Sequence, residues 1–217
     1  MHIEIGILTD DKLLYAGVAA TALVAAHLPT VVRKPANLLR TALAAFFFSL
    51  LMQAWHLPIG PSELHMVGAM PIYLLFGFVP TLLGFGVGLF LQAALFEPQD
   101  MLHLAVNFLS LAVPLMAVHH TLGQRLQQLS VRKVLQLDGV YYTGVTLMVG
   151  FWLSISTETT AFAQWAAFAA SYISLVLLEP VLTMGIVALG SRMQGKAPRL
   201  LQWALDEAWL KRTAVTA

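Results

Sequence analysis

The sequence predicts an all-α polytopic membrane protein with seven transmembrane helices. Three observations support this prediction: the composition, the long apolar runs and the placement of the basic residues. Of the 217 residues, 59% are apolar and 11% are charged, whereas a soluble domain carries about 25% charged residues. With a mean hydropathy of +0.77, a chain of 23.7 kDa cannot cover a water-exposed surface. We therefore exclude a soluble enzyme and a disordered chain.

Seven apolar runs define the predicted helices. A helix needs about 20 residues to cross about 30 Å of hydrocarbon, and five of the runs reach that length comfortably. Residues 66–96 form either one long helix or two short helices with a break near Gly77 to Thr81, and Glu179-Pro180 raises the same question in the last run. The predicted runs are 13–32, 38–55, 66–79, 81–96, 101–121, 134–155 and 161–190.

The positions of lysine and arginine decide how many helices cross the membrane. Basic residues concentrate in cytoplasmic loops, whereas acids carry little weight in orientation. With seven helices, every lysine and arginine except Lys12 lies on one side, and each alternative places a basic cluster on the wrong side. We therefore predict an external N-terminus and a cytoplasmic C-terminus in the inner (plasma) membrane of the cell. The inner basic residues are Arg33, Lys34, Arg40, Arg125, Arg132, Lys133, Arg192, Lys196, Arg199, Lys211 and Arg212.

The two ends of the chain carry further expectations. No basic segment precedes an apolar core, and Met1-His2 leads into Asp10-Asp11. We therefore expect no signal peptide and a mature N-terminus at Met1. Residues 198–213 are predicted to form a short amphipathic helix in a cytoplasmic tail, either as an interfacial anchor or as a docking surface for a partner.

The N-terminal residues can bind a metal ion. There are no cysteines, so any ligands are histidine, carboxylate, amide, thioether or main-chain groups. The Met1 amine, the deprotonated main-chain nitrogen of His2 and the Nδ1 atom of His2 can close fused chelate rings in one plane. One further imidazole completes a square-planar nitrogen site, a geometry that suits Ni(II) or Cu(II) and, less obviously, Co(II).

His65 lies in a sequence context that suits a binding site. It opens the shortest apolar run, which also contains Gly68, Pro71 and Gly77. Short membrane segments interrupted by glycine or proline indicate a transporter's binding site, because their freed backbone must line a cavity. The alternative is a loop histidine in front of an ordinary broken helix.

Several motifs in the first half of the chain resemble those of a known family. They are Met1-His2-Ile3, then Ser62-Glu63-Leu64-His65 before a glycine-rich hydrophobic stretch, and Leu91-Gln92-Ala93-Ala94-Leu95-Phe96 followed by Asn107. Together they resemble the substrate-binding M subunits, of CbiM or NikM type, of cobalt and nickel energy-coupling factor (ECF) transporters. The resemblance runs over most of residues 1–115 and continues afterwards mainly as hydropathy.

The resemblance implies a seven-helix fold in which the N-terminal segment inserts into the bundle from outside. It also implies that the metal is held by the N-terminal amine, the amide and ring nitrogens of the second residue and a later histidine, which fall here on Met1, His2 and His65. Residues 1–217 would then form a single transmembrane substrate-binding domain whose transported substrate is Ni2+ or Co2+. The implied partners are a transmembrane coupling subunit, ATPase subunits and a small accessory membrane subunit, with no nucleic acid.

Two segments depart from the family pattern. The family places glutamate directly before glycine near its start, whereas here Ile5 separates Glu4 from Gly6. The glycine-rich segment that precedes the family's Ala-Asn pair also differs, over residues 100–107. Both changes touch loops that would close over the metal, so the choice between nickel and cobalt stays open.

Three further residues are candidates to orient the ligands, because a metal-bound histidine usually pairs its other ring nitrogen. Glu63 and Asn107 are expected in this role, and His103 either joins them or supplies an additional donor. The alternatives are a solvated loop acid for Glu63 and a helix–helix hydrogen bond for Asn107.

Asp138 and Glu179 lie inside or close to the last two helices. Intramembrane acids are costly and mark functional sites by default. One expectation is pairing with Arg132, Lys133 or Arg192, and the other is a role in metal exit or subunit coupling.

The first two helices are rich in alanine. Small residues let helices approach closely in lipid. We expect these faces to pack within the bundle, with docking onto the coupling subunit as the alternative.

The sequence therefore predicts a transport subunit that captures a metal ion, rather than an enzyme. No Gly-x-x-x-x-Gly-Lys-Ser/Thr pattern is present, so a separate ATPase must supply the energy. One alternative is a polytopic scaffold or assembly protein without bound metal. A membrane metalloenzyme is less favoured, because the adjacent His119 and His120 lack the helical spacing that such a site needs.

Overall fold

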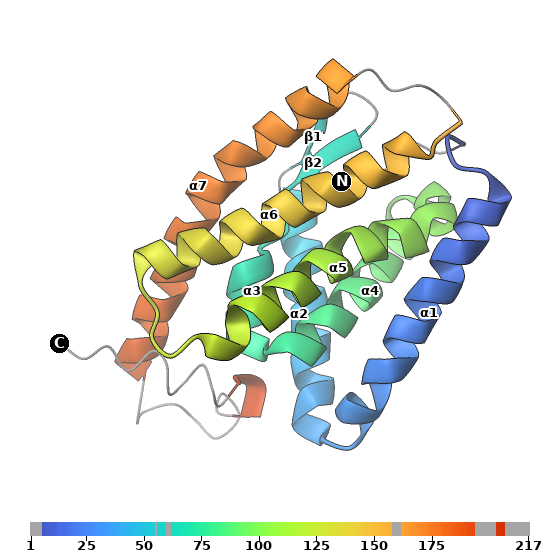
Figure 1. Ribbon diagram of the computed structural model, residues 1–217. Helices are drawn as coiled ribbons and strands as arrows, with labels where there is room; N and C mark the ends of the chain where they lie inside the picture. Colours follow the sequence, from blue (N-terminus) through green and yellow to red (C-terminus); the bar gives the residue numbers. More distant parts are fainter. Residues whose placement is uncertain (1–5, 55, 60–61, 158–161, 194–202, 207–217) are drawn as a thin grey trace.

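The computed structural model describes residues 6–54, 56–59, 62–157, 162–193 and 203–206. The described chain forms seven α helices, two short 3-10 helices and an antiparallel hairpin of two strands (Figure 1). In chain order the elements are α1 (Asp10–Val32), α2 (Pro35–Ala54), β1 (His56–Ile59), β2 (Ser62–His65), α3 (Ala69–Phe76), α4 (Phe78–Leu95), η1 (Pro98–His103), α5 (Leu104–Thr121), η2 (Gly123–Arg125), α6 (Val131–Ser154) and α7 (Phe162–Met193).

The seven helices correspond to the seven predicted runs, but they are not equivalent membrane spans. Five segments are long and apolar enough to cross a membrane, and they contain α1, α2, α4, α5 and α7. With 24 residues, α6 is also long enough, but it is more polar and buries Asp138, Tyr141 and Tyr142. With 8 residues, α3 extends only about 12 Å and cannot cross alone. The protein is thus a polytopic membrane protein in which the third predicted run forms a helix too short to cross the membrane.

The third predicted run differs most from the expectation. The chain is extended through β2 and irregular up to Gly68, so a short hairpin that was not predicted accompanies the seven helices of the all-helical fold. The predicted break is confirmed, because Gly77 has a φ of +85° and separates α3 from α4. The prediction of one continuous last helix is also confirmed, because α7 runs through Pro180.

Helices α2 and α4 pack closely because α4 presents glycine to its neighbour. A Cβ atom on Gly84 would lie 2.6 Å from the Cβ atom of Ala44, and one on Gly88 would lie 2.4 Å from the ring of Phe48. Gln92 adds a hydrogen bond of 2.8 Å from its Nε2 atom to a main-chain carbonyl of α2. Small residues thus bring two helices together in the absence of a hydrophobic driving force between them. The expectation that the alanine-rich faces pack within the bundle is therefore confirmed for the part of α2 around Ala44.

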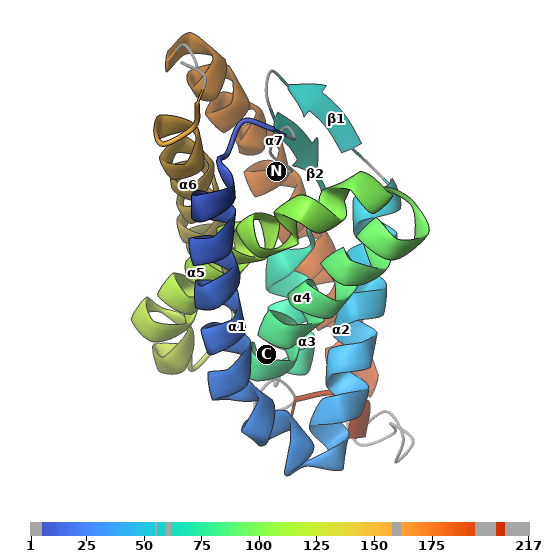
Figure 2. The ribbon, with the colours of Figure 1, turned by 90° about the vertical axis from the view of Figure 1, so that its right-hand side faces the viewer.

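The hairpin lies at one end of the bundle, next to α7 (Figures 1 and 2). In the bundle, α6 packs against α5 and α7, while α1 packs against α5 and α2. The end of α6 and the start of α7 lie at the same end as the hairpin, and the loops after α1 and α5 lie at the opposite end. This arrangement separates the predicted outer and inner ends of the molecule.

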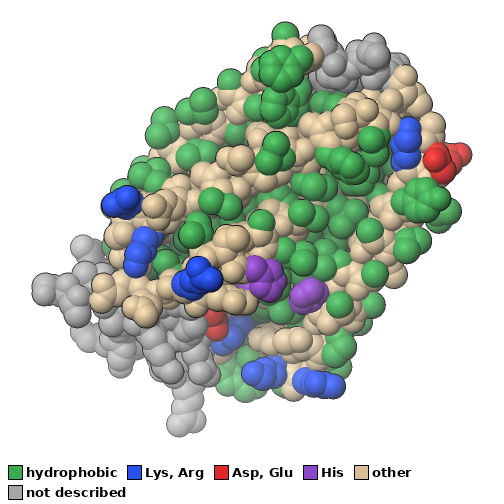
Figure 3. Space-filling model, in the orientation of Figure 1, with side chains coloured by type: hydrophobic (Ala, Val, Ile, Leu, Met, Phe, Trp, Pro, Cys, Tyr) green, Lys and Arg blue, Asp and Glu red, His purple; other side chains and the backbone are tan. Residues whose placement is uncertain are grey.

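The surface of the bundle is apolar over a broad band. Figure 3 shows hydrophobic side chains across most of one face, with basic side chains gathered toward the end opposite the hairpin. Leu14, Phe46 and Leu177 are exposed by 66%, 59% and 64%. Large apolar patches of this kind are rare on soluble monomers. The band therefore fits a protein whose helices face hydrocarbon.

Candidate metal centre

His65 ends β2, and its side chain is buried. Its Cα atom pairs with that of His56 across the hairpin, and the residue is only 4% exposed. β2 packs against α7, and the preceding Leu64 is 1% exposed. The hairpin therefore carries the predicted imidazole ligand into the protein instead of leaving it in a solvated loop.

The chain turns between β2 and α3 at Gly68. Its φ of +63° lies in the left-handed region, which glycine adopts without steric cost. A Cβ atom at this position would lie 2.2 Å from the Cδ1 atom of Leu51. Gly68 thus meets two requirements at once, a left-handed backbone and a close approach to α2.

Glu179 of α7 accepts the hydrogen bonds of this irregular segment. The main-chain N–H of Met70 donates to its Oε1 atom over 2.9 Å, and the main-chain N–H of Gly68 donates to the same carboxyl group. The hydroxyl of Tyr142 donates to the Oε2 atom. Non-helical backbone at membrane depth needs such partners, because hydrocarbon offers none. Since Glu179 is 0% exposed, α7 holds the start of α3 inside the bundle.

Met1 and His2, the other predicted ligands, lie outside the described residues. The chain soon after them is packed into the protein, since Ile7 is 7% and Leu8 is 4% exposed. The carbonyl oxygen of Ile7 accepts hydrogen bonds from the main-chain N–H of Thr157, over 2.8 Å, and from its hydroxyl, over 3.1 Å. These contacts anchor the first described residues at the end of the bundle that carries the hairpin.

Two of the three residues expected to orient the ligands are buried at the start of α5. His103 and Asn107 are each 1% exposed, and their spacing places them on one face of the chain. The Oδ1 atom of Asn107 has no hydrogen-bond donor among the described residues. Glu63 lies in β2 opposite Pro58, and its side chain is outside the described part. Contact of these residues with a metal ligand stays a prediction.

The histidines near the opposite end take part in packing and hydrogen bonding. The Nδ1 atom of His119 lies 2.9 Å from the hydroxyl of Tyr73, and its ring stacks on Phe78 at 4.0 Å. The Nδ1 atom of His27 lies 2.9 Å from the carbonyl oxygen of Leu23. Within the described ranges, no group of three or more His, Cys, Asp or Glu residues is placed to hold a metal ion.

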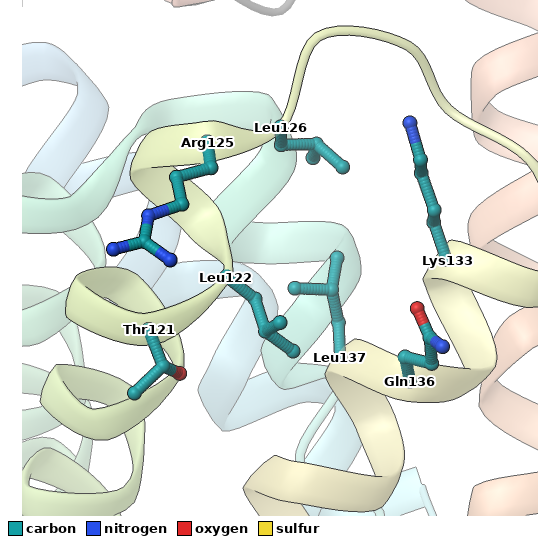
Figure 4. A pocket seen from close by; sticks show the side chains of 7 residues that line it. All are labelled: Thr121, Leu122, Arg125, Leu126, Lys133, Gln136 and Leu137. Atoms are coloured by element: carbon teal, nitrogen blue, oxygen red, sulfur yellow. The ribbon is translucent and has the colours of Figure 1, made fainter.

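A cavity of about 200 Å³ lies between the end of α5 and the start of α6 (Figure 4). Arg125 and Lys133 line it, and like charges repel, so this cavity does not suit a metal cation. Its basic character fits the cytoplasmic side predicted for this end. The other lining residues are Thr121, Leu122, Leu126, Gln136 and Leu137.

Pairing of Asp138 with Arg132 or Lys133, one of the two expectations from the sequence, is wrong for the described residues. The Nζ atom of Lys133 donates to the carbonyl of Gln128 over 3.0 Å, and Arg132 is exposed. The carboxyl group of Asp138 instead lies next to that of Glu179, and both residues are 0% exposed. The side chain of Arg192 is not among those described.

The tyrosines that surround these acids were not predicted as part of a site. Tyr141 and Tyr142 follow Asp138 by three and four residues, a spacing that places all three on one helix face. Tyr172 comes from α7 and packs its ring 5.1 Å from that of Tyr142. The spacing within α6 was readable in the sequence, whereas the contact with α7 was not.

Comparison with known proteins gives one informative result. No curated protein and no solved structure matches the chain at a significant level. The family model of CbiM, the cobalt uptake substrate-specific transmembrane region, matches residues 2–197. The matched stretch contains all seven helices and the hairpin.

Proposed function

Because the chain belongs to the CbiM family of cobalt uptake substrate-specific transmembrane regions, we propose that it captures its metal ion in a square-planar, all-nitrogen site. Membership makes it a multi-pass membrane component of a cobalt uptake transporter, and not an enzyme. The proposed ligands are the Met1 amine, the amide and Nδ1 nitrogens of His2, and an imidazole nitrogen of His65. The transported substrate is Co2+, with Ni2+ as the alternative.

The observation that carries this proposal is the burial of His65 inside the bundle. A loop histidine with no ligand role would be hydrated, whereas this residue is 4% exposed at the end of a strand packed against α7. The irregular chain that follows it is held by Gly68 and Glu179. Interrupted segments of this kind line the substrate sites of membrane transporters.

The packing of the N-terminal segment supports the same site. Ile7 and Leu8 are buried, and Ile7 is tied to the loop before α7. Four residues lie between Met1 and Gly6, where the described chain begins, and an extended chain spans about 3.3–3.6 Å per residue. The proposed amine ligand can therefore lie at most about 18 Å from Gly6.

The chemistry of this donor set explains selectivity against hard cations. Nitrogen donors in one plane suit late divalent transition metals, whereas Mg2+ and Ca2+ prefer oxygen. The His2 amide must lose its proton to bind, so the metal displaces a proton as it enters. Glu63, His103 and Asn107 would orient the ligands through the ring nitrogens that do not touch the metal.

The transport cycle requires other subunits. With the N-terminus outside and the C-terminus in the cytoplasm, the site takes its ion from the outer side. A transmembrane coupling subunit and ATPase subunits of an ECF transporter would then reorient the loaded protein, and a small accessory membrane subunit completes the proposed assembly.

Blocking the N-terminal amine tests the site. One alanine added before Met1, or His65→Ala, should weaken Co(II) binding to the purified protein by more than about 100-fold in isothermal titration. His120→Ala, at an exposed histidine, is the matched control and should bind normally. Titrations with Ni(II), Cu(II) and Zn(II) rank the metals. Unchanged binding in the blocked protein would exclude the Met1 amine as a ligand, and no Co(II) binding by the unmodified protein would favour the scaffold alternative.

A further inference from the structure

Five oxygen-bearing side chains meet where α6 and α7 pass the start of α3. Asp138, Tyr141 and Tyr142 come from α6, and Tyr172 and Glu179 come from α7. The two acids are 0% exposed, and the tyrosines are exposed by 2% or less. This cluster lies in the interior of a membrane bundle and is separate from the nitrogen site proposed above.

The hydrogen bonds of this cluster are unevenly distributed. Glu179 accepts from the main-chain N–H of Met70 and from the hydroxyl of Tyr142. Neither oxygen of Asp138 has a hydrogen-bond donor among the described residues, and the hydroxyls of Tyr141 and Tyr172 have no partner there either. In the described chain the Asp138 carboxyl group therefore has only the neighbouring carboxyl group of Glu179 as a partner, and two buried hydroxyls lack the partners that burial normally demands.

The negative charges of the two carboxylates are also not balanced in the part of the chain that the structure describes. Within the described chain, the titratable groups that face Asp138 and Glu179 are the neighbouring tyrosines, and the two acids also face each other. The segment at the start of α3 contributes main-chain N–H groups. Two adjacent carboxylates in a low-dielectric interior repel strongly. A proton between them, or a cation, is needed to bring the cluster towards neutrality.

The donor set selects the kind of cation. Carboxylate and hydroxyl oxygens bind divalent cations of hard or intermediate character, and two carboxylates balance a charge of two. We propose that Asp138 and Glu179, with the Tyr141 hydroxyl, form a second, all-oxygen site for the divalent ion on its way inward. The inference depends on the proposed transport of a divalent metal by this chain.

The location of the two acids fits a second binding site on the inner side of the capture site. Asp138 is seven residues from the start of α6, about 10 Å along the helix from its predicted cytoplasmic end. Glu179 is bonded to Gly68 and Met70, on the segment that leads away from His65. When an ion enters, it replaces the proton shared by the two carboxyl groups, and that proton leaves. Oxygen ligands hold cobalt and nickel less tightly than planar nitrogen ligands, so the ion can move on.

Counting bound Co(II) by equilibrium dialysis of the full chain in nanodiscs separates the two sites. The unmodified protein should bind two ions, one tightly and one weakly. Asp138→Asn should lose only the weak ion, and one alanine added before Met1 should lose only the tight ion. Asp10→Asn, at an exposed acid, and Thr146→Val, at another buried polar residue of α6, are the controls and should keep both ions.

A second probe avoids dependence on one variant. Mn(II), which prefers oxygen ligands, should bind once to the unmodified chain in electron paramagnetic resonance titrations. Tyr141→Phe should weaken that binding severalfold while keeping the tight Co(II) ion. Retention of the weak ion in Asp138→Asn, or binding of a single ion by the unmodified chain, overturns the second site. Retention of the tight ion in the blocked chain overturns the proposed function instead.

Discussion

The main-chain N–H of Met70 donates to the Oε1 atom of Glu179 over 2.9 Å, across 109 residues of sequence. This hydrogen bond joins the first turn of α3 to the middle of α7. It satisfies a donor that the helix start leaves free, and the positive end of the helix dipole favours a carboxylate there. The segment that presents His65 is therefore held by an acid from the last helix.

Replacing Glu179 with glutamine should destabilise the protein. Glutamine keeps one acceptor oxygen but turns an NH2 group towards either Met70 or Tyr142, which are both donors. Loss of a charge-assisted hydrogen bond costs about 1.5–3 kcal/mol, and thermal unfolding in detergent should report a lower midpoint. Asp138→Asn is the matched control, because Asp138 has no donor to lose among the described residues. Equal midpoints for the two variants would contradict this role of Glu179.

Replacing Gly68 with alanine should disturb the turn before α3. The left-handed backbone and the 2.2 Å approach to Leu51 together cost about 1–3 kcal/mol. Gly17→Ala, where a Cβ atom meets nothing within 4 Å, should be neutral or slightly stabilising. Thermal unfolding compares the two, and Leu51→Ala in the Gly68→Ala background should recover part of the loss. No difference between the two alanine variants would show that the turn is not restricted as described.

The proposed amide ligand makes metal affinity depend on pH. Because the metal must displace the proton of the His2 amide, affinity should fall steeply from about pH 8 to about pH 5. Isothermal titration of Co(II) across this range measures the effect. Removal of the metal by a chelator should be correspondingly faster in acid. A flat profile would exclude the amide nitrogen from the ligand set.

The described part of the tail is attached beneath α3. The main-chain N–H of Asp206 donates to the carbonyl of Leu75 over 2.7 Å, and Arg40 lies 3.6 Å from the Asp206 carboxylate while donating to the carbonyl of Trp203 over 3.1 Å. Arg40→Ala should therefore speed hydrogen exchange of residues 203–206, although the free energy of unfolding changes by less than about 1 kcal/mol. Arg33→Ala, at an exposed arginine, should leave the exchange unchanged. Equal exchange rates in both variants would refute this attachment.

Much of the fold could be predicted from periodicity and composition. Long apolar runs identify membrane helices because each crossing needs a minimum length, and Gly77 marked the break between α3 and α4. The four-residue strands were missed because such short segments form only by pairing with each other, and that pairing depends on the surrounding bundle. The start of α3 could not be predicted for a related reason, since it is set by Gly68 and by a carboxylate from α7.

The candidate site was predicted unevenly. His65 was selected from its position before an interrupted apolar run and from the family motif, and its role as a ligand stays a prediction. Two of the expected partners of Asp138, Arg132 and Lys133, were wrong because neighbours in sequence were preferred to a residue on the next helix. The Asp138 to Tyr142 spacing was visible in the sequence, but only the packing of α6 on α7 reveals that Glu179 completes the cluster.

The two ends of α3 are fixed to different parts of the chain, at Met70 by α7 and at Leu75 by the tail. A helix that is hydrogen-bonded at both ends cannot move along its axis without breaking one of these hydrogen bonds. A displacement of the tail would thus be transmitted along this helix to its other end, about 12 Å away. The shortest α helix of the described chain therefore couples the position of the tail to that of α7.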